Sequence, residues 1–250
     1  GQLQWLNLKE NNLAGPLPAQ LSDLTQLRAL NLKRNAVTGS VPTTLGSLPL
    51  LQTLDLSENS LSGTIPPQLG NLAALQILNL SNNQLTGAVP TQLTGLAALQ
   101  SLNLSSNQLA GQIPAALGGM ANLRTLALNT NQLSGAIPNQ LGNLANLQQL
   151  VLNNNGLTGS IPASFGGLNN LNTLVLSYNQ LDGQIPSQLG NLRQLSALML
   201  RTNPLSGEIP ASLGSLGSIF EIWLNSNALS GAVPASLCDL PGLFFLDVGF

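Results

Sequence analysis

The chain has 250 residues, of which 43% are hydrophobic and 6% charged, and its formal net charge of −2 is too small to direct it to nucleic acid or an anionic membrane. It contains no histidine, which excludes catalytic triads, general bases and metal sites that depend on imidazole. Its one cysteine, Cys238, cannot form an intramolecular disulfide or a thiolate zinc site, and no apolar run is long enough to span a bilayer.

A 24-residue repeat runs through the whole chain. Each repeat carries an Asn in the same phase, preceded by aliphatic residues at −8, −5 and −3 and followed by an aliphatic residue at +2, Gly at +4, an aliphatic residue at +6 and Pro at +7. The unit reads LxxLxLxxNxLxGxIPxxLxxL. These Asn residues stand at 11, 35, 59, 83, 107, 131, 155, 179, 203 and 227. Self-similarity at this period predicts a stacked repeat architecture.

The first element of each repeat is a short strand. In the fifth repeat, Leu102 and Leu104 alternate with polar neighbours, which is the pattern of a strand with one buried face. We therefore expect Ser101, Asn103 and Ser105 to point outward. One such strand cannot bury its apolar face alone, so neighbouring repeats must stack into a parallel sheet. Ten strands spaced about 4.8 Å apart make a ladder of about 50 Å.

The repeated Asn comes next and is expected to point inward, where its carboxamide can bond the backbone of its own turn and of adjacent turns. The Gly that follows permits a tight bend, and the Pro restricts the chain to an extended or turn conformation. The LxGxI stretch between them alternates again and predicts a second short strand. A brief helical or 3₁₀ turn is expected after it, around LGxL.

This motif resembles that of leucine-rich repeat proteins, and its LxGxIP part is similar to the plant-specific subclass found in receptor-kinase ectodomains, receptor-like proteins and polygalacturonase-inhibiting proteins. The resemblance covers the whole chain. It implies an α/β repeat solenoid, a right-handed superhelix with a concave parallel β-sheet and short helical or 3₁₀ turns on the convex side. Residues 1–250 then form a single solenoid of ten repeats and a partial one, without evident capping domains or the paired cap cysteines usual in this subclass.

Because the coil requires the residues at the fixed positions, ligand contacts are expected at the variable, outward positions of the strand face. Charge gathers at the two ends of the chain, since Arg124 is the only charged residue between Glu58 and Asp182. This placement indicates a binding face, although a solvated ladder of cross-strand ion pairs would look the same. The charged candidate ligand contacts are Lys9, Lys33, Arg34, Asp55, Glu58, Arg201 and Glu221.

Apolar and aromatic residues form a second set of candidates. The position four residues before the repeated Asn is polar in the first repeats and apolar in the later ones. Tyr, Trp and Met are enriched at the energetic centres of interfaces, so we add Val175, Tyr178, Met199 and Trp223 to the candidate contacts. The alternative for the aromatic residues is packing beneath a C-terminal cap, which we favour for Phe220, Phe244, Phe245 and Phe250.

Two sequons, at Asn79 and Asn103, are candidate glycosylation sites on the strand face. The Asn-Leu-Ser wording is also what the repeat consensus produces at this phase. Glycans there would cover the middle of the face and direct a protein partner toward its ends.

Three functions fit the sequence. The first is a non-catalytic recognition module, extracellular or part of a cell-surface ectodomain, that binds a protein, a peptide or a carbohydrate through its concave face without a cofactor, a metal, nucleic acid or membrane contact. The second is ice binding through ladders of Ser, Thr and Asn. One such ladder is Ser57, Ser81, Ser105, Asn79 and Asn103, and another is Thr38, Ser62, Thr86, Ser134 and Thr158. The third is a regular scaffold without a ligand of its own.

Overall fold

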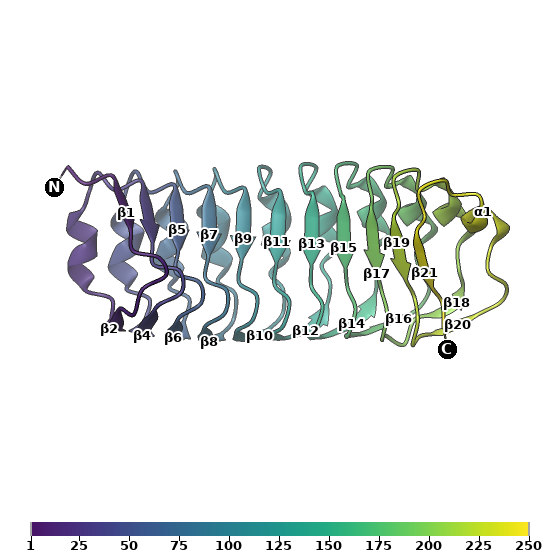
Figure 1. Ribbon diagram of the computed structural model, residues 1–250, viewed down its shortest axis with the longest axis horizontal. Coiled ribbons are helices and arrows are strands. Elements are labelled where there is room, and N and C mark those ends of the chain that lie inside the picture. The colour runs from purple at the N-terminus through teal and green to yellow at the C-terminus, as the bar shows by residue number, and fades with distance from the viewer. Residues whose placement is uncertain (1, 250) are drawn as a thin grey trace.

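The computed structural model describes residues 2–249, which form a stack of coils with the two chain ends at opposite ends of the stack (Figure 1). One strand from each coil contributes to a continuous parallel sheet of eleven strands. We call its outward surface the strand face. In order along the stack, the sheet contains β1 (Trp5–Asn7), β3 (Ala29–Asn31), β5 (Thr53–Asp55), β7 (Ile77–Asn79), β9 (Ser101–Asn103), β11 (Thr125–Ala127), β13 (Gln149–Val151), β15 (Thr173–Val175), β17 (Ala197–Met199), β19 (Glu221–Trp223) and β21 (Phe245–Asp247).

The register of this sheet follows the sequence period. Leu30 lies opposite Leu54, which lies opposite Leu78. Each strand residue therefore lies opposite the residue 24 positions further along the chain. These three leucines are fully buried, and the equivalent leucines of the other central strands form one core that runs the length of the solenoid. A shift of one residue would turn every leucine to solvent, so the apolar pattern fixes the register.

A second parallel sheet forms along one side of the stack from the predicted LxGxI strands. Its eight strands are β2 (Ala14–Pro16), β4 (Ala36–Ser40), β6 (Ser60–Thr64), β8 (Gln84–Gly87), β10 (Gln108–Gly111), β12 (Gln132–Ala136), β14 (Gly156–Ser160) and β16 (Gln180–Asp182), and a separate pair follows with β18 (Ser206–Glu208) and β20 (Ala228–Ser230).

The interruption between β16 and β18 has a cause in the sequence. In other repeats the residue after the repeated Asn donates its backbone N–H to the preceding coil, as Ala36 does to Leu13 O and Ala228 to Leu205 O. Pro204 occupies this position in the ninth repeat and has no N–H to donate. The ladder therefore loses a hydrogen bond at this point.

Short helical turns cover the side opposite the strand face (Figure 1), as the LGxL segments predict. Each follows a Pro in extended conformation and buries its central apolar side chain, except for the first turn, which buries none. They are the 3₁₀ turns η1 (Ala19–Asp23), η2 (Thr43–Ser47), η3 (Pro67–Asn71), η4 (Thr91–Gly95), η5 (Ala115–Gly119), η6 (Asn139–Asn143), η7 (Ala163–Gly167), η8 (Ser187–Asn191) and η9 (Ala211–Ser215), and the one-turn helix α1 (Ala235–Cys238).

The repeated Asn joins successive coils, which confirms the inward orientation expected from its chemistry. Asn59 Nδ2 donates to the carbonyl oxygens of Leu56 and Ser57 in its own coil, at 3.1 and 3.0 Å, and to Leu32 O in the preceding coil, at 2.9 Å. Asn59 Oδ1 accepts from Val37 N at 3.0 Å. One side chain thus makes hydrogen bonds to four backbone groups in two successive coils.

The bend after each Asn is made by the Gly at +4, which has a positive φ in all ten repeats, from 71° to 88°. The residue directly before the Asn is also left-handed in every repeat, with φ between 53° and 58°, although none of these residues is glycine. Tyr178 and Thr130 are among them. A non-glycine residue in this region is strained, and β-branched residues are the least suited to it.

Candidate ligand-binding surfaces on the strand face

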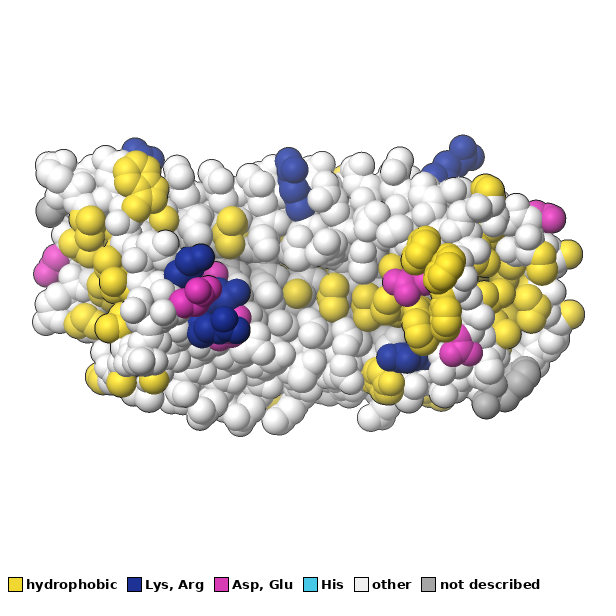
Figure 2. Space-filling view, in the orientation of Figure 1, with side chains coloured by type: hydrophobic (Ala, Val, Ile, Leu, Met, Phe, Trp, Pro, Cys, Tyr) yellow, Lys and Arg dark blue, Asp and Glu magenta, His cyan; other side chains and the backbone are white. Residues whose placement is uncertain are grey.

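The strand face carries two separate clusters of candidate residues, which lie toward its two ends. Figure 2 shows one cluster of dark blue and magenta side chains toward the N-terminal end, and a second group with yellow aromatic side chains toward the C-terminal end. The strand pairs place side chains 24 residues apart beside each other, as for Val175 and Met199 or for Met199 and Trp223. The uniform sheet thus converts a column of sequence positions into a continuous surface.

In the N-terminal cluster, Glu58 bridges two basic residues. Lys33 Nζ lies 3.2 Å from Glu58 Oε1, and Arg34 Nε lies 3.1 Å from Glu58 Oε2. The hydrogen bond from Lys33 is the main cause that lowers the pKa of the Glu58 carboxyl, against a smaller opposing effect of desolvation, and the charges of Lys33 and Arg34 lower it further. The Arg34 side chain is 69% exposed, so water screens this pair and it adds little stability.

Asp55 and Lys9 lie outside this ion-pair network. Asp55 Oδ1 instead accepts from the backbone N and the hydroxyl of Ser57, at 3.0 and 2.6 Å. Lys9 is exposed, and its side chain has no ion-pair partner among residues 2–249. The charged residues at this end thus form one three-residue cluster and not a ladder that follows the sheet.

The serines two residues before the repeated Asn do not face solvent, which corrects the expectation that this column points outward. Ser57 is 1% exposed, Ser81 4% and Ser105 9%. This burial does not depend on a hydrogen bond, since Ser177, which has Val175 two positions earlier, is also only 3% exposed. In these three coils an Asx residue stands two positions before the serine. Its side-chain oxygen accepts from both the backbone N and the hydroxyl of the serine, as Asn79 Oδ1 does from Ser81 and Asn103 Oδ1 from Ser105. The Ser57, Ser81 and Ser105 ladder is therefore not available to an ordered surface.

The same hydrogen bonds involve the two sequon asparagines. Asn79 and Asn103 are half-buried, and in each the Oδ1 atom is engaged by the serine of its own sequon. The Nδ2 atom, to which a glycan would be attached, makes no hydrogen bond within the described chain. Glycosylation at these positions remains a prediction, and the local structure leaves the acceptor nitrogen free for it.

At the C-terminal end, Arg201 lies between two aromatic rings. Its guanidinium carbon is 5.1 Å from the centre of the Tyr178 ring and 4.8 Å from that of Trp223. Trp223 also stacks on Phe245, with ring centres 4.2 Å apart, and its Nε1 donates to Glu221 Oε2 at 2.8 Å. The rings restrict the motion of Arg201 while its N–H groups make no hydrogen bond within residues 2–249, so a cation is held in place with its donors unused.

Two buried polar atoms in this region have no hydrogen-bond partner among residues 2–249. They are Ser177 Oγ and Asn225 Oδ1, at the same position of the repeat as Arg201, one coil before it and one after it. Ser177 lacks the acceptor that Asn79 gives Ser81, because Val175 occupies the equivalent position. Trp223 occupies the equivalent position before Asn225, but the unpaired Asn225 Oδ1 is an acceptor and lacks a donor, not an acceptor. Each unpaired buried group costs about 1–3 kcal/mol, so the apolar column here comes at a loss of stability.

Phe245, which we expected to pack beneath a C-terminal cap, instead stacks on Trp223 in this cluster. Asn225 was absent from the sequence-based prediction, although it stands two residues after Trp223 in the sequence, which was the available signal. Phe220 and Phe244 stack on each other with ring centres 5.1 Å apart and remain 52% and 78% exposed. Phe250 lies outside the described residues.

Among residues 2–249, no group of three or more Cys, Asp or Glu side chains comes together in a way that could hold a metal ion. No helix in this range is long and apolar enough to cross a membrane.

Comparison with protein families identifies the repeat. The model of a leucine-rich repeat region matches residues 2–156, and a second leucine-rich repeat model matches residues 146–205. This chain is a leucine-rich repeat protein. Comparison with curated protein sequences finds no match.

Solved structures place the leucine-rich repeat chain among plant-type proteins. The ectodomain of the Arabidopsis receptor kinase HAESA, in complex with an IDA peptide hormone, is 38% identical over 98% of this chain, with a TM-score of 0.94. The plant peptide hormone receptor RGFR1, in complex with RGF2, is 34% identical over 99% of the chain, with a TM-score of 0.91. A plant ice-binding protein is 29% identical over 98%, with a TM-score of 0.80. The chain covers 81% of the ice-binding protein but only 41% and 43% of the two receptors.

Proposed function

We propose that this leucine-rich repeat protein is a non-catalytic, extracellular recognition module that binds a peptide or a protein loop on the C-terminal part of its strand face. The observation that carries this proposal is Arg201, held between Tyr178 and Trp223 with its N–H groups unpaired. HAESA and RGFR1 are similar ectodomains in complex with peptide hormones, which supports a peptide as the class of ligand.

The geometry indicates what such a ligand needs. Arg201 offers planar donors to a carboxylate or carbonyl oxygen, and both rings next to it are partly exposed. Val175 and Met199 extend an apolar surface from Trp223 toward the middle of the sheet. An extended segment with one acidic or carbonyl anchor and apolar neighbours matches this surface. The rigid sheet keeps the contact residues in place before binding, which lowers the ordering cost.

The experiment is a selection of displayed random peptides on the unmodified protein, followed by affinity measurements with variants. The double variant Tyr178→Ala, Trp223→Ala should lose at least 30-fold in affinity, as expected when two aromatic anchors are removed. The matched control Lys33→Ala, Arg34→Ala changes the exposed charges of the N-terminal cluster and should change affinity by less than threefold. Equal losses in both variants would contradict the proposed location.

A second candidate function, ice binding, is favoured by one specific surface. The outward residues of β4 to β14 in the second sheet are all uncharged, and most are Ser, Thr, Gln or Ala. Thr38, Thr86, Ser134 and Thr158 are exposed there, in contrast to the buried serines of the strand face. The similarity to a plant ice-binding protein supports this alternative.

An ice-recrystallisation assay separates the two candidates. If the second sheet binds ice, the unmodified protein inhibits recrystallisation and Thr86→Lys, Thr158→Lys abolishes the inhibition, because two ammonium groups disrupt the uncharged surface. The Tyr178→Ala, Trp223→Ala variant should then inhibit as well as the unmodified protein. Absence of inhibition by the unmodified protein would exclude this function.

A further inference from the structure

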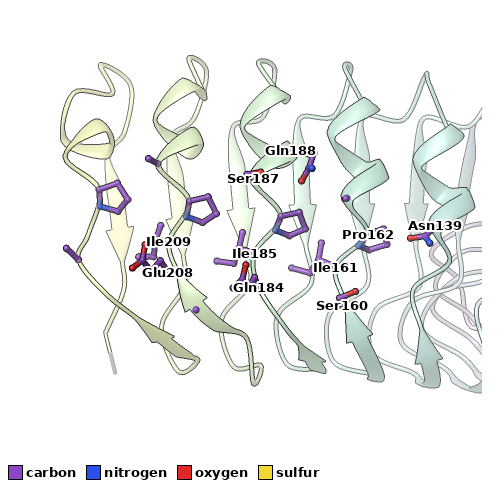
Figure 3. Close-up of a pocket in the computed structure, with 17 residues that line it drawn as sticks. Asn139, Ser160, Ile161, Pro162, Gln184, Ile185, Ser187, Gln188, Glu208 and Ile209 are labelled. Carbon is purple, nitrogen blue, oxygen red and sulfur yellow. The ribbon is translucent and has the colours of Figure 1, made fainter.

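A groove runs along one side of the solenoid, where the second sheet meets the row of helical turns (Figure 3). It has a volume of about 1020 Å³ and receives residues from five successive repeats. The prolines that precede the turns line it in a row: Pro162, Pro186, Pro210 and Pro234. The groove lies away from the strand face and shares no residue with either cluster there.

Polar side chains flank the proline row on both sides. Figure 3 shows Ser160, Gln184 and Glu208 along the edge next to the second sheet. Asn139 and Gln188 lie along the other edge, which the helical turns supply. None of these five side chains makes a hydrogen bond to another group within residues 2–249. The groove therefore presents the partly exposed rings of Pro186, Pro210 and Pro234, with Pro162 buried at one end of the row, between two rows of unused donors and acceptors.

The interruption of the second sheet falls within this stretch. Gln184 follows β16, the last strand of the eight-stranded sheet, whereas Glu208 ends β18, the first strand of the separate pair. Pro204, which removes a ladder hydrogen bond between these strands, lies in the coil between them along the chain. The groove thus coincides with the one break among the described strands of this sheet.

We propose that this groove binds a neutral, extended polysaccharide of β-linked pyranose units. Sugar rings carry apolar C–H faces, which suit the proline row, and hydroxyl groups at their edges, which suit the two polar rows. The strand spacing of about 4.8 Å is close to the length of one such unit, so successive sugars can meet equivalent side chains. An extended peptide advances only about 3.3 Å per residue and loses this register within two repeats.

Charge decides between neutral and acidic polysaccharides. Glu208 is the only charged residue that lines the groove, and no lysine or arginine lines it. A polyuronate would place its carboxylates beside Glu208 without a compensating cation, which disfavours binding. The ligand class is therefore a neutral glucan-like chain.

The test uses isothermal titration of the full chain with cellohexaose, and with hexagalacturonate as the acidic counterpart. We expect saturable binding of cellohexaose and at least tenfold weaker binding of hexagalacturonate. The variant Gln184→Ala, Gln188→Ala should weaken cellohexaose binding at least fivefold. Gln112→Ala, Gln92→Ala is the matched control, because these glutamines occupy the same repeat positions outside the groove, and it should bind within twofold of the unmodified protein.

Three results would overturn the proposal: no binding of cellohexaose, equal losses in the groove and control variants, or preference for hexagalacturonate. The Tyr178→Ala, Trp223→Ala variant should bind cellohexaose normally. Its behaviour keeps the two proposals distinguishable, because failure of peptide binding on the strand face leaves the groove unaffected.

Discussion

The two ends of the strand face differ in how they treat the same repeat position. In the N-terminal half, Asn79 accepts hydrogen bonds from Ser81, and the polar groups under the surface are satisfied. In the C-terminal half, Val175 replaces that Asn and leaves the hydroxyl of Ser177 buried without a partner. The backbone is the same in both places, since the strands keep one register throughout.

We interpret this difference as one between scaffold and candidate site. In the N-terminal half, this repeat position carries the Asx residue that gives the most internal hydrogen bonds. The C-terminal half loses hydrogen bonds and gains an apolar and aromatic surface around Arg201. Residues that lower the stability of the fold are expected at binding sites, because contacts with the partner compensate for the internal interactions that are lost there. The variants below test this comparison, from the largest expected effect on stability to the smallest.

The largest effect should be the same in both halves, because the repeated Asn serves the coil everywhere. Asn83→Ala and Asn203→Ala each remove four hydrogen bonds at a site less than 10% exposed. At about 1 kcal/mol per bond, each should lower the free energy of unfolding by about 4 kcal/mol. Urea denaturation followed by circular dichroism measures this. A difference of more than 2 kcal/mol between the two variants would mean that the halves do not share one scaffold.

The next effect should have opposite signs in the two halves. Asn79→Val leaves the Ser81 hydroxyl buried without its acceptor and should cost about 2 kcal/mol, whereas Val175→Asn provides Ser177 with an acceptor and should gain about 1 kcal/mol. The same denaturation experiment checks both. If Val175→Asn destabilises the protein, the missing hydrogen bond is not what distinguishes the C-terminal half.

A smaller effect concerns the left-handed position before the repeated Asn. Thr130 has a φ of 56°, which is unfavourable for a β-branched residue, so Thr130→Asn should raise the free energy of unfolding by about 1 kcal/mol. Tyr178→Asn relieves the same kind of strain but removes the ring that stacks on Arg201. We expect it to gain less stability than Thr130→Asn and to weaken peptide binding. An unchanged affinity would argue against a role for Tyr178 in recognition.

The smallest effect should come from the Glu58 ion pairs. Because the folded-state pKa of Glu58 lies below its ordinary value, ionised Glu58 stabilises the fold above the unfolded-state pKa of about 4.3, and this contribution is lost as the pH falls through the lower folded-state value. The variant Glu58→Gln should remove that part of the acid sensitivity. Denaturation curves at neutral and acidic pH, at low and high salt, measure it. An effect that survives high salt would contradict a solvent-screened pair.

Much of the fold follows from the sequence because every repeat carries the same pattern of core and turn residues. The period places Leu54 in the core, the carboxamide chemistry places Asn59 inside the turn, and the fold-level prediction of a leucine-rich repeat solenoid is confirmed. The serine column was predicted wrongly because the alternation of inward and outward side chains does not continue beyond the last residue of the strand. Ser81 lies beyond β7, where it is buried and donates to Asn79 Oδ1.

The candidate sites could be predicted only in part. The columns of the repeat placed Val175, Met199 and Trp223 beside one another, but the position of Arg201 between two rings depends on side-chain conformations that spacing does not determine. The groove depends on how the second sheet meets the helical turns, which is a property of packed coils. Pro204 was the one signal of irregularity there, and it looks like a minor variation of the consensus.

The most direct test of the central claim is the affinity of one selected peptide for the unmodified protein, for Arg201→Gln and for Lys33→Ala, Arg34→Ala, measured by isothermal titration. We expect Arg201→Gln to lose at least tenfold in affinity without a loss of stability that would account for it, and the N-terminal variant to bind within threefold of the unmodified protein. Normal binding by Arg201→Gln, with loss in the N-terminal variant, would place the recognition site at the other end of the strand face.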